Sequence, residues 1–264
     1  MRLYTVIIII LCITASAISC GRSAEEEQRI NQAERDSLRR LDSLALKVGV
    51  LPTEECLPIV VAEKLRLFDT LNVSVHLRHY HALSECRIAL NNKLVEGAVI
   101  DTMLSTIMDS VVYSSMRLPM TWKLLTAKKA RISRLDQLAD KMIAADSHGC
   151  SHALAQQVND TLKVKKKQAF IIQVEDIRVR TQMLTTGNVD AALLPEPFAA
   201  QAKREGAREI PLRNINAGVV AFRKKGMNDE YRKKQEKLFI KAIQSANDSI
   251  HRYGKDKYKN LIAW

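Results

Sequence analysis

The chain has 264 residues, a net charge of +12 and only 5% aromatic residues, and it contains no internal repeat or low-complexity tract. The excess of lysine and arginine would by itself permit a nucleic-acid partner, but these residues are scattered and no recognition motif accompanies them. We therefore expect no nucleic-acid partner, and we interpret the basic residues as solvated faces that also attract an anionic ligand or membrane surface.

Residues 1–20 form a predicted export signal. Arg2 supplies a positive start, residues 6–13 are apolar, and Ala17-Ile-Ser places small residues just before Cys20. The apolar stretch is shorter than the roughly 20 residues that a membrane-spanning helix needs. The segment resembles a bacterial lipoprotein signal, which implies that Cys20 becomes the lipidated first residue of an envelope protein facing the periplasm. An ordinary secreted protein is the alternative.

Residues 21–45 are predicted to form a charged helical tether. Glutamate and arginine dominate the segment, and its apolar stripe is thin, with Ile30, Leu38, Leu41 and Leu44. A short coiled coil is the alternative, but fewer than about three good heptads disfavour it.

Strands then alternate with helices from residue 46 onward. The expected strands are 46–51, 72–80 and 97–101, and the expected helices are 57–68, 82–93 and 102–108. This alternation predicts βαβ units and a parallel sheet. The loops 52–56, 79–82 and 101–105 should therefore emerge at one edge of the sheet.

A second series of strands and helices follows a crossing in residues 119–127. We expect strands at 141–145 and 167–174, a helix at 147–158, and then the most informative stretch, residues 185–200. Residues 208–212 and 217–223 should lead back to the first lobe, on which an amphipathic helix at 229–253 should pack.

The stretch 185–200 combines a helix end, a buried strand and a rigid acidic turn. Gly187 follows a helical pattern and can close the helix in the left-handed conformation. Val189 and residues 191–194 form a nearly continuous apolar run, which is typical of a strand covered on both faces. Two prolines then bracket Glu196, which places a carboxylate at the carboxyl end of a strand, where α/β sheets bind ligands.

This stretch, with its Gly-Asn-Val-Asp-Ala sequence, resembles a segment of the periplasmic solute-binding proteins of nitrate, sulfonate, taurine and thiamine-precursor ABC importers. A second phrase in residues 132–150 resembles the same family, although Asp140 replaces a usual glycine and His148 and Cys150 enter a loop usually built of glycine, serine and threonine. The resemblance covers about residues 46–222.

The resemblance implies an α/β, two-lobed type II periplasmic-binding-protein fold with parallel-dominated sheets and two hinge crossings, near residues 120 and 214. Lobe 1 would comprise residues 46–120 and 214–264, and lobe 2 would comprise residues 121–213.

Candidate ligand contacts lie in the loops at the expected strand ends. The loop that begins at Ser147 opens a helix, whose N-terminal N–H groups can bind an anion, although Ser147 could simply cap that helix. Glu54 and Glu55 could likewise cap the helix that follows them. The expected ligand contacts are Thr53, Glu54, Tyr80, Thr102, Ser147, His148, Ser151 and Glu196.

The histidines and cysteines show no compact metal-binding spacing, so we expect no metal site and no cofactor. In an oxidising compartment Cys56 and Cys86 are a candidate disulfide, which would leave Cys150 unpaired.

Together these observations predict a monomeric substrate-binding lipoprotein that captures a small polar or anionic solute and delivers it to an importer permease. The solute could be a sulfonate, a nitrate-like anion or a thiamine-precursor-like pyrimidine. One alternative is an enzyme on the same fold, resembling a dehydratase or a pyrimidine synthase. His148 and Cys150 faintly resemble the histidine and the cysteine-rich segment of the pyrimidine synthase. A metal or metal-chelate binder is another.

Overall fold

The structure, a computed structural model, describes residues 24–164, 167–212, 217–224 and 229–264. The chain divides into two compact units, Met1–Leu44 and Ala45–Trp264. The predicted export signal and Cys20 lie outside the described residues. Among the described residues, no helix combines the length and apolarity needed to cross a bilayer.

The described part of the first unit is one helix, α2 (Ala24–Leu44). It confirms the helix predicted for the tether segment. Residues 26–37 are exposed, in agreement with their charged composition.

The second unit contains two five-stranded sheets. The first sheet has the order β2-β1-β3-β10-β4. Its strands are β1 (Leu46–Val50), β2 (Val75–His79), β3 (Gly97–Asp101), β4 (Val112–Leu118) and β10 (Gly218–Arg223). Strand β1 pairs in parallel with β2 and β3, whereas β10 is antiparallel to both β3 and β4.

The second sheet has the order β7-β6-β8-β5-β9, which repeats the arrangement of the first. Its strands are β5 (Lys123–Thr126), β6 (Met142–Ala145), β7 (Phe170–Gln173), β8 (Ala191–Leu194) and β9 (Arg208–Ile210). Strand β6 is parallel to β7 and β8, and β5 is antiparallel to β8 and β9. Each sheet is therefore mixed, with three adjacent parallel strands and one antiparallel strand beside them.

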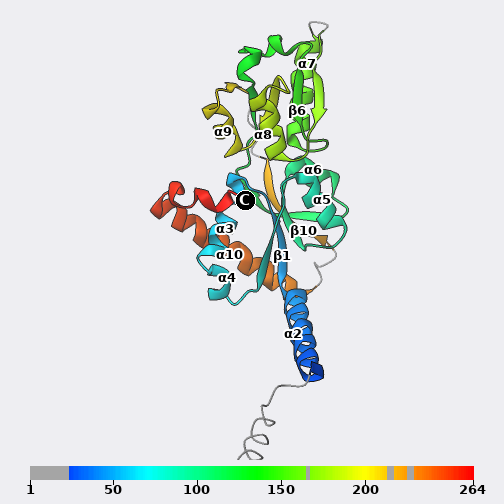
Figure 1. The fold of residues 1–264 in the computed structure, drawn as a ribbon, viewed down its shortest axis with the longest axis vertical. Helices are drawn as coiled ribbons and strands as arrows, with labels where there is room; N and C mark the ends of the chain where they lie inside the picture. Colours follow the sequence, from blue (N-terminus) through cyan, green and yellow to red (C-terminus); the bar gives the residue numbers. More distant parts are fainter. Residues whose placement is uncertain (1–23, 165–166, 213–216, 225–228) are drawn as a thin grey trace, which may run out of the picture. The chain divides into compact units, whose positions relative to one another are not determined.

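Helices cover these sheets. In the first sheet's part of the chain they are α3 (Leu57–Lys64), α4 (Leu67–Thr70), α5 (Leu83–Asn91), α6 (Thr102–Ile107) and α10 (Glu230–Tyr253). In the second they are α7 (Cys150–Lys163), α8 (Ile177–Thr186) and α9 (Phe198–Arg204). In Figure 1, α5 and α6 lie on one side of β1, and α3, α4 and α10 lie on the other.

Helix α10 packs on the first sheet, as its apolar stripe predicted. The ring of Phe239 stacks on Phe68 at 5.5 Å between centroids and meets Phe222 of β10 edge-on at 5.9 Å. Such aromatic pairs add to the free energy of burial, and all three rings are buried here. Strand β10 and helix α10 therefore belong with the sheet in which the second unit begins.

Around β8, the helix end at Gly187 and the buried strand are as predicted, whereas the cap at the start of α8 was not predicted. Asp176 caps α8 by accepting hydrogen bonds from the N–H groups of Arg178 and Val179, and Gly187 ends the helix with a φ of +78°. All four residues of β8 are buried, as a strand covered on both faces requires.

Two predictions of elements were wrong in detail. Strand β4 was not predicted, because its burial alternates irregularly along residues with serines in the middle. Helix α7 begins at Cys150 and not at residue 147, since residues 146–149 form a loop around the side chain of Asp146. The lobe boundaries stay a prediction, and residue 214 lies outside the described residues.

Candidate functional site

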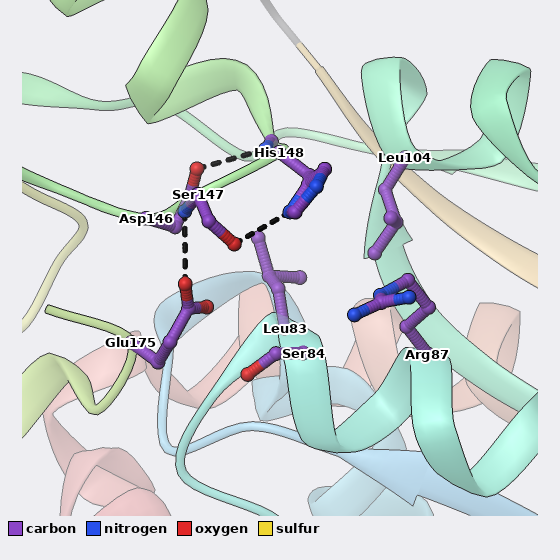
Figure 2. Close-up of a pocket in the computed structure, with 9 residues that line it drawn as sticks. Leu83, Ser84, Arg87, Leu104, Asp146, Ser147, His148 and Glu175 are labelled. Carbon is purple, nitrogen blue, oxygen red and sulfur yellow. Dashed lines mark hydrogen bonds between the residues drawn. The ribbon is translucent and has the colours of Figure 1, made fainter. Parts of the chain in front are cut away.

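A small cavity is lined by residues from the segments that connect the strands of the first sheet and of the second sheet (Figure 2). The segments after β2 and β3 contribute one wall, with Leu83, Ser84, Arg87 and Leu104. The segments after β6 and β7 contribute the other, with Asp146, Ser147, His148, Gly149 and Glu175. The volume open to the centre of a water molecule is about 10 Å³, so the two walls almost meet.

Asp101 joins the two walls. It is the last residue of β3 and is fully buried. One carboxylate oxygen caps α6 by accepting from the Leu104 N–H at 2.8 Å, and the other accepts from the Cys150 N–H of α7 at 2.6 Å. Burial, and to a smaller extent the nearby charge of Asp146, raises the pKa of Asp101 to about 6 against the lowering effect of these two N–H groups.

Asp146 organises the loop between β6 and α7. Its Oδ1 accepts from the N–H groups of Gly149 at 2.8 Å and His152 at 3.3 Å, and its own N–H donates to Ser151 Oγ at 2.9 Å. Its Oδ2 is buried and has no hydrogen-bond partner in the described part of the chain. A Cβ on Gly149 would stand 2.5 Å from Asp101 Oδ2 and 2.8 Å from Asp146 Oδ2, so only glycine fits between the two carboxylates.

Arg180 of α8 is a buried cation behind this loop, with 1% of its surface exposed. Its guanidinium donates to the carbonyl oxygens of Val174 at 2.7 and 2.9 Å and of Leu193 at 2.9 Å. Longer bonds reach Ser151 Oγ at 3.4 Å and the Glu175 carbonyl at 3.5 Å. Burial lowers the pKa of Arg180. The guanidinium also lies 5.6 Å from the ring centroid of Trp122, as in a cation–π contact.

Two of the predicted ligand contacts line the cavity. The N–H of Ser147 donates to Glu175 Oε1 at 2.9 Å, and its hydroxyl lies 2.5 Å from Nδ1 of His148. Figure 2 shows these two side chains on the wall opposite Arg87. Ser151 and Thr102 lie next to the cavity and do not line it. The Ser151 hydroxyl is bonded within the protein, and Thr102 Oγ1 is 3.8 Å from the Cys150 sulfur.

The other predicted contacts do not line this cavity. Thr53 is buried and its hydroxyl faces the Cys56 sulfur at 3.7 Å, while Glu54 forms an ion pair with Lys255. The ring of Tyr80 lies over Gly49, within 3.0 Å of where a Cβ would stand. Their contact with a ligand stays a prediction.

Glu196 has protein partners for both carboxylate oxygens. Oε1 accepts from Lys123 Nζ at 2.7 Å and Oε2 accepts from the Ala200 N–H at 2.9 Å. Burial alone would raise the pKa of Glu196, but these bonds outweigh it and lower the pKa. Its main chain touches the first βα loop, because the Glu196 carbonyl accepts from the Glu54 N–H at 3.0 Å. The structure thus gives Glu196 a structural role that its sequence context did not reveal.

Cys56 and Cys86, predicted as a candidate disulfide, are both free and buried. The Cys56 sulfur instead accepts hydrogen bonds from the Leu51 N–H at 3.3 Å and from the Thr53 hydroxyl, which explains its place in the loop after β1. Among the described residues no three histidine, cysteine or acidic side chains gather as a metal site would require.

The sequence analysis missed the buried charged residues of the site. Asp101 is the last residue of one buried apolar strand and Asp146 directly follows another, and this placement at a strand end was the signal that could have identified them. Arg87 and Glu175 lie in segments without a recognisable motif.

No protein-family model and no curated protein sequence matches the chain. Solved structures do match. One is the alkanesulfonate-binding protein SsuA from Xanthomonas axonopodis pv. citri bound to MOPS, with a TM-score of 0.69 and 15% identity over 83% of this chain and 78% of that chain. Another is the periplasmic nitrate-binding protein NrtA from Synechocystis PCC 6803, with a TM-score of 0.66 and 12% identity over 77% of this chain and 61% of that one.

A third match is an ancestral arginine-binding protein bound to arginine, with a TM-score of 0.57 and 15% identity over 82% of this chain and 96% of that one. These three proteins bind solutes of different charge, so the shared architecture does not by itself select a ligand. The predicted architecture is confirmed: the chain has the two-sheet α/β fold of the periplasmic solute-binding proteins of ABC importers.

Proposed function

We propose that this protein is the exported solute-binding component of an ABC-type importer. It captures a small polar solute between lobe 1 (residues 46–120 and 214–264) and lobe 2 (residues 121–213) and delivers it to a permease. The observation that supports this most directly is the bond from the Cys150 N–H to Asp101, which joins the strand ends of the two sheets beside a cavity. A solute that binds both walls would shift the population toward the closed form.

The site favours binding over catalysis. Cys150 is the most obvious nucleophile beside the cavity, but burial, and then the charge of Asp101, raises the pKa of its thiol to about 11. A thiol reacts as its thiolate, which is scarce at neutral pH when the pKa is that high. We therefore propose a binding protein without turnover.

The solute is small and polar, and the candidates remain a sulfonate, a nitrate-like anion or a thiamine-precursor-like pyrimidine. Two proteins of similar fold bind an alkanesulfonate and nitrate, and this analogy of fold is what supports the first two candidates.

The envelope location is part of the same proposal. Residues 1–20 act as a lipoprotein signal, Cys20 carries the lipid, and residues 21–45 act as a tether for a monomeric solute-binding unit. Substituting Cys20→Ser should move the protein from the membrane fraction to the soluble fraction. Retention of the variant in the membrane fraction would contradict lipid anchoring, and light scattering of the purified protein tests the monomer.

The decisive experiment is native mass spectrometry of gently purified protein, combined with small-angle X-ray scattering. We expect a small molecule to co-purify, and we expect the radius of gyration to increase when it is removed by mild denaturation and refolding. Absence of any bound small molecule, together with no change in the radius of gyration across a solute panel, would refute the proposed function.

A further inference from the structure

The carboxylate of Asp146 is incompletely satisfied. Only 3% of the residue is exposed, and Asp146 lines the cavity between the two walls. Its Oδ1 accepts two backbone N–H groups, whereas Oδ2 has no donor among the described residues. Leaving a buried charged acceptor without a donor costs more free energy than leaving a neutral one unpaired. A group from outside the protein could supply the missing donor.

The nearest buried cation cannot supply it. A guanidinium has five N–H donors, and all five of Arg180 are used by the Val174, Leu193 and Glu175 carbonyl oxygens and by Ser151 Oγ. Arg180 therefore attracts Asp146 through its charge but has no N–H left for Oδ2 or for an anionic solute.

The carboxylates near Asp146 increase the negative potential at this point. Asp101 Oδ2 and Asp146 Oδ2 flank the same position at Gly149, and Glu175 lines the same cavity. The mutual repulsion of two buried carboxylates is one reason why the pKa of Asp101 is raised. A positive group of the solute would relieve this repulsion.

The opposite wall carries a positive side chain. Arg87 of α5 is half-buried and lines the cavity, and no hydrogen bond or ion pair joins its side chain to another residue of the described part of the chain. Figure 2 shows Arg87 across the cavity from the Asp146 loop. The two walls therefore present opposite charges to one small space.

We propose that the solute is a small zwitterion, with a protonated amine that donates to Asp146 Oδ2 and an anionic group that faces Arg87. This rests on the proposed function and names the solute's chemical class. The cavity volume of about 10 Å³ equals roughly one water molecule, so it matches the ammonium group alone. The remainder of the solute is accommodated when the two lobes are further apart than in this structure.

The test compares probes that differ only in the amine. Binding of taurine and ethanesulfonate, and of β-alanine and propionate, is measured by isothermal titration calorimetry on the full mature protein. A charge-assisted hydrogen bond contributes about 1.5–3 kcal/mol, so we expect each zwitterion to bind about 30-fold more tightly than its amine-free counterpart.

The variant Asp146→Asn keeps the shape of the side chain and should reduce that preference to less than about threefold. The matched control is Asp160→Asn on the exposed face of α7, where the carboxylate pairs only with Lys163 at the surface. The control should keep the preference, and unchanged melting temperatures confirm that both variants fold.

Three outcomes would overturn the inference. Ethanesulfonate or propionate binding as tightly as its zwitterion would exclude the amine contact while leaving the proposed function in place. An unchanged preference in Asp146→Asn would mean that Oδ2 holds only a water molecule. If no probe binds, and the solute that co-purifies in native mass spectrometry lacks either charged group, the inference is again wrong. Only the absence of any bound solute would remove the proposed function as well.

Discussion

The backbone N–H of Cys150 donates to Asp101 Oδ2 at 2.6 Å, which links the first residue of α7 to the last residue of β3. The same carboxylate caps α6 through the Leu104 N–H. The Asp101 side chain thus caps helix α6, which belongs to the first sheet's part of the chain. It also binds the first residue of helix α7, which belongs to the second sheet's part.

Replacing Asp101 should both destabilise and open the protein. Asp101→Ala removes a helix cap, worth about 1 kcal/mol, and a charge-assisted bond between the walls, so we expect the free energy of unfolding to fall by about 2 kcal/mol at pH 7.5. The radius of gyration of the solute-free protein should increase. Urea denaturation and X-ray scattering measure the two effects.

The control for this variant is Asp109→Ala, whose side chain is 83% exposed and pairs with Lys224 at the surface. We expect a change below about 0.5 kcal/mol, because exposed ion pairs contribute little. Equal effects of the two substitutions would show that Asp101 does not join the walls.

The stability of the protein should depend on the ionisation of Glu55. This residue is 4% exposed, its Oε1 has no hydrogen-bond partner among the residues that the structure describes, and burial raises its pKa to about 7. When the pKa of an acid is higher in the folded state than in the unfolded state, the unfolded chain releases the proton at a lower pH than the folded protein does. The folded state therefore loses stability as the pH rises from about 4.5 to about 7, and no further loss follows above that range.

Glu55→Gln removes this ionisation. The variant should match the wild type near pH 4.5 and exceed it at pH 8.5 by an amount on the order of 3 kcal/mol, since one pKa unit corresponds to about 1.4 kcal/mol. Chemical denaturation at several pH values measures the difference. If the difference in the free energy of unfolding between the variant and the wild type did not change with pH, the pKa of Glu55 would not be raised in the folded protein.

Arg180 should be essential to the second sheet's part of the fold. Arg180→Lys removes the planar fork that bonds the Val174 and Leu193 carbonyl oxygens, and a buried ammonium cannot reproduce it. We expect the free energy of unfolding to fall by about 3 kcal/mol. Arg178→Lys, on the same helix but paired with Asp176 near the surface, should change it by less than about 0.5 kcal/mol. Thermal and urea denaturation of the two variants tests this contrast.

The thiols of Cys56, Cys86 and Cys150 should all be free in the isolated protein. Iodoacetamide without reductant should alkylate them fully after denaturation, and only slowly in the native state, because burial raises the pKa of each thiol. Peptide mapping by mass spectrometry detects each product. A disulfide-linked peptide pair containing Cys56 and Cys86 would contradict the structure.

The strands and the order of elements could be predicted well where apolar runs are short and bounded. Residues 97–100 and 191–194 are each a continuous apolar run with a polar or proline boundary, and both lie in strands that are buried throughout. Strand β4 lacked such a run. Its place beside β10 depends on pairing with residues about 100 positions later in the chain, which local patterns do not encode.

The site could be predicted only in part, for a related reason. Ser147 and His148 follow a predicted strand, and they do line the cavity. Arg180 fell at a buried position of a predicted helical pattern, but its role depends on carbonyl oxygens that only the folded chain brings within reach. Glu196 looked available because its partner, Lys123, is 73 residues away. Spacing along the sequence cannot show which charges are neutralised by distant ones.

The position of β10 has a consequence for synthesis of the chain. Residues 218–223 insert between β3 and β4, so the first sheet remains divided until the last fifth of the polypeptide has left the ribosome. Until then β3 exposes an unpaired edge. A nascent chain of this topology therefore needs protection late in translation, and a gene truncated before residue 218 should yield an insoluble product rather than a half-sized binding protein.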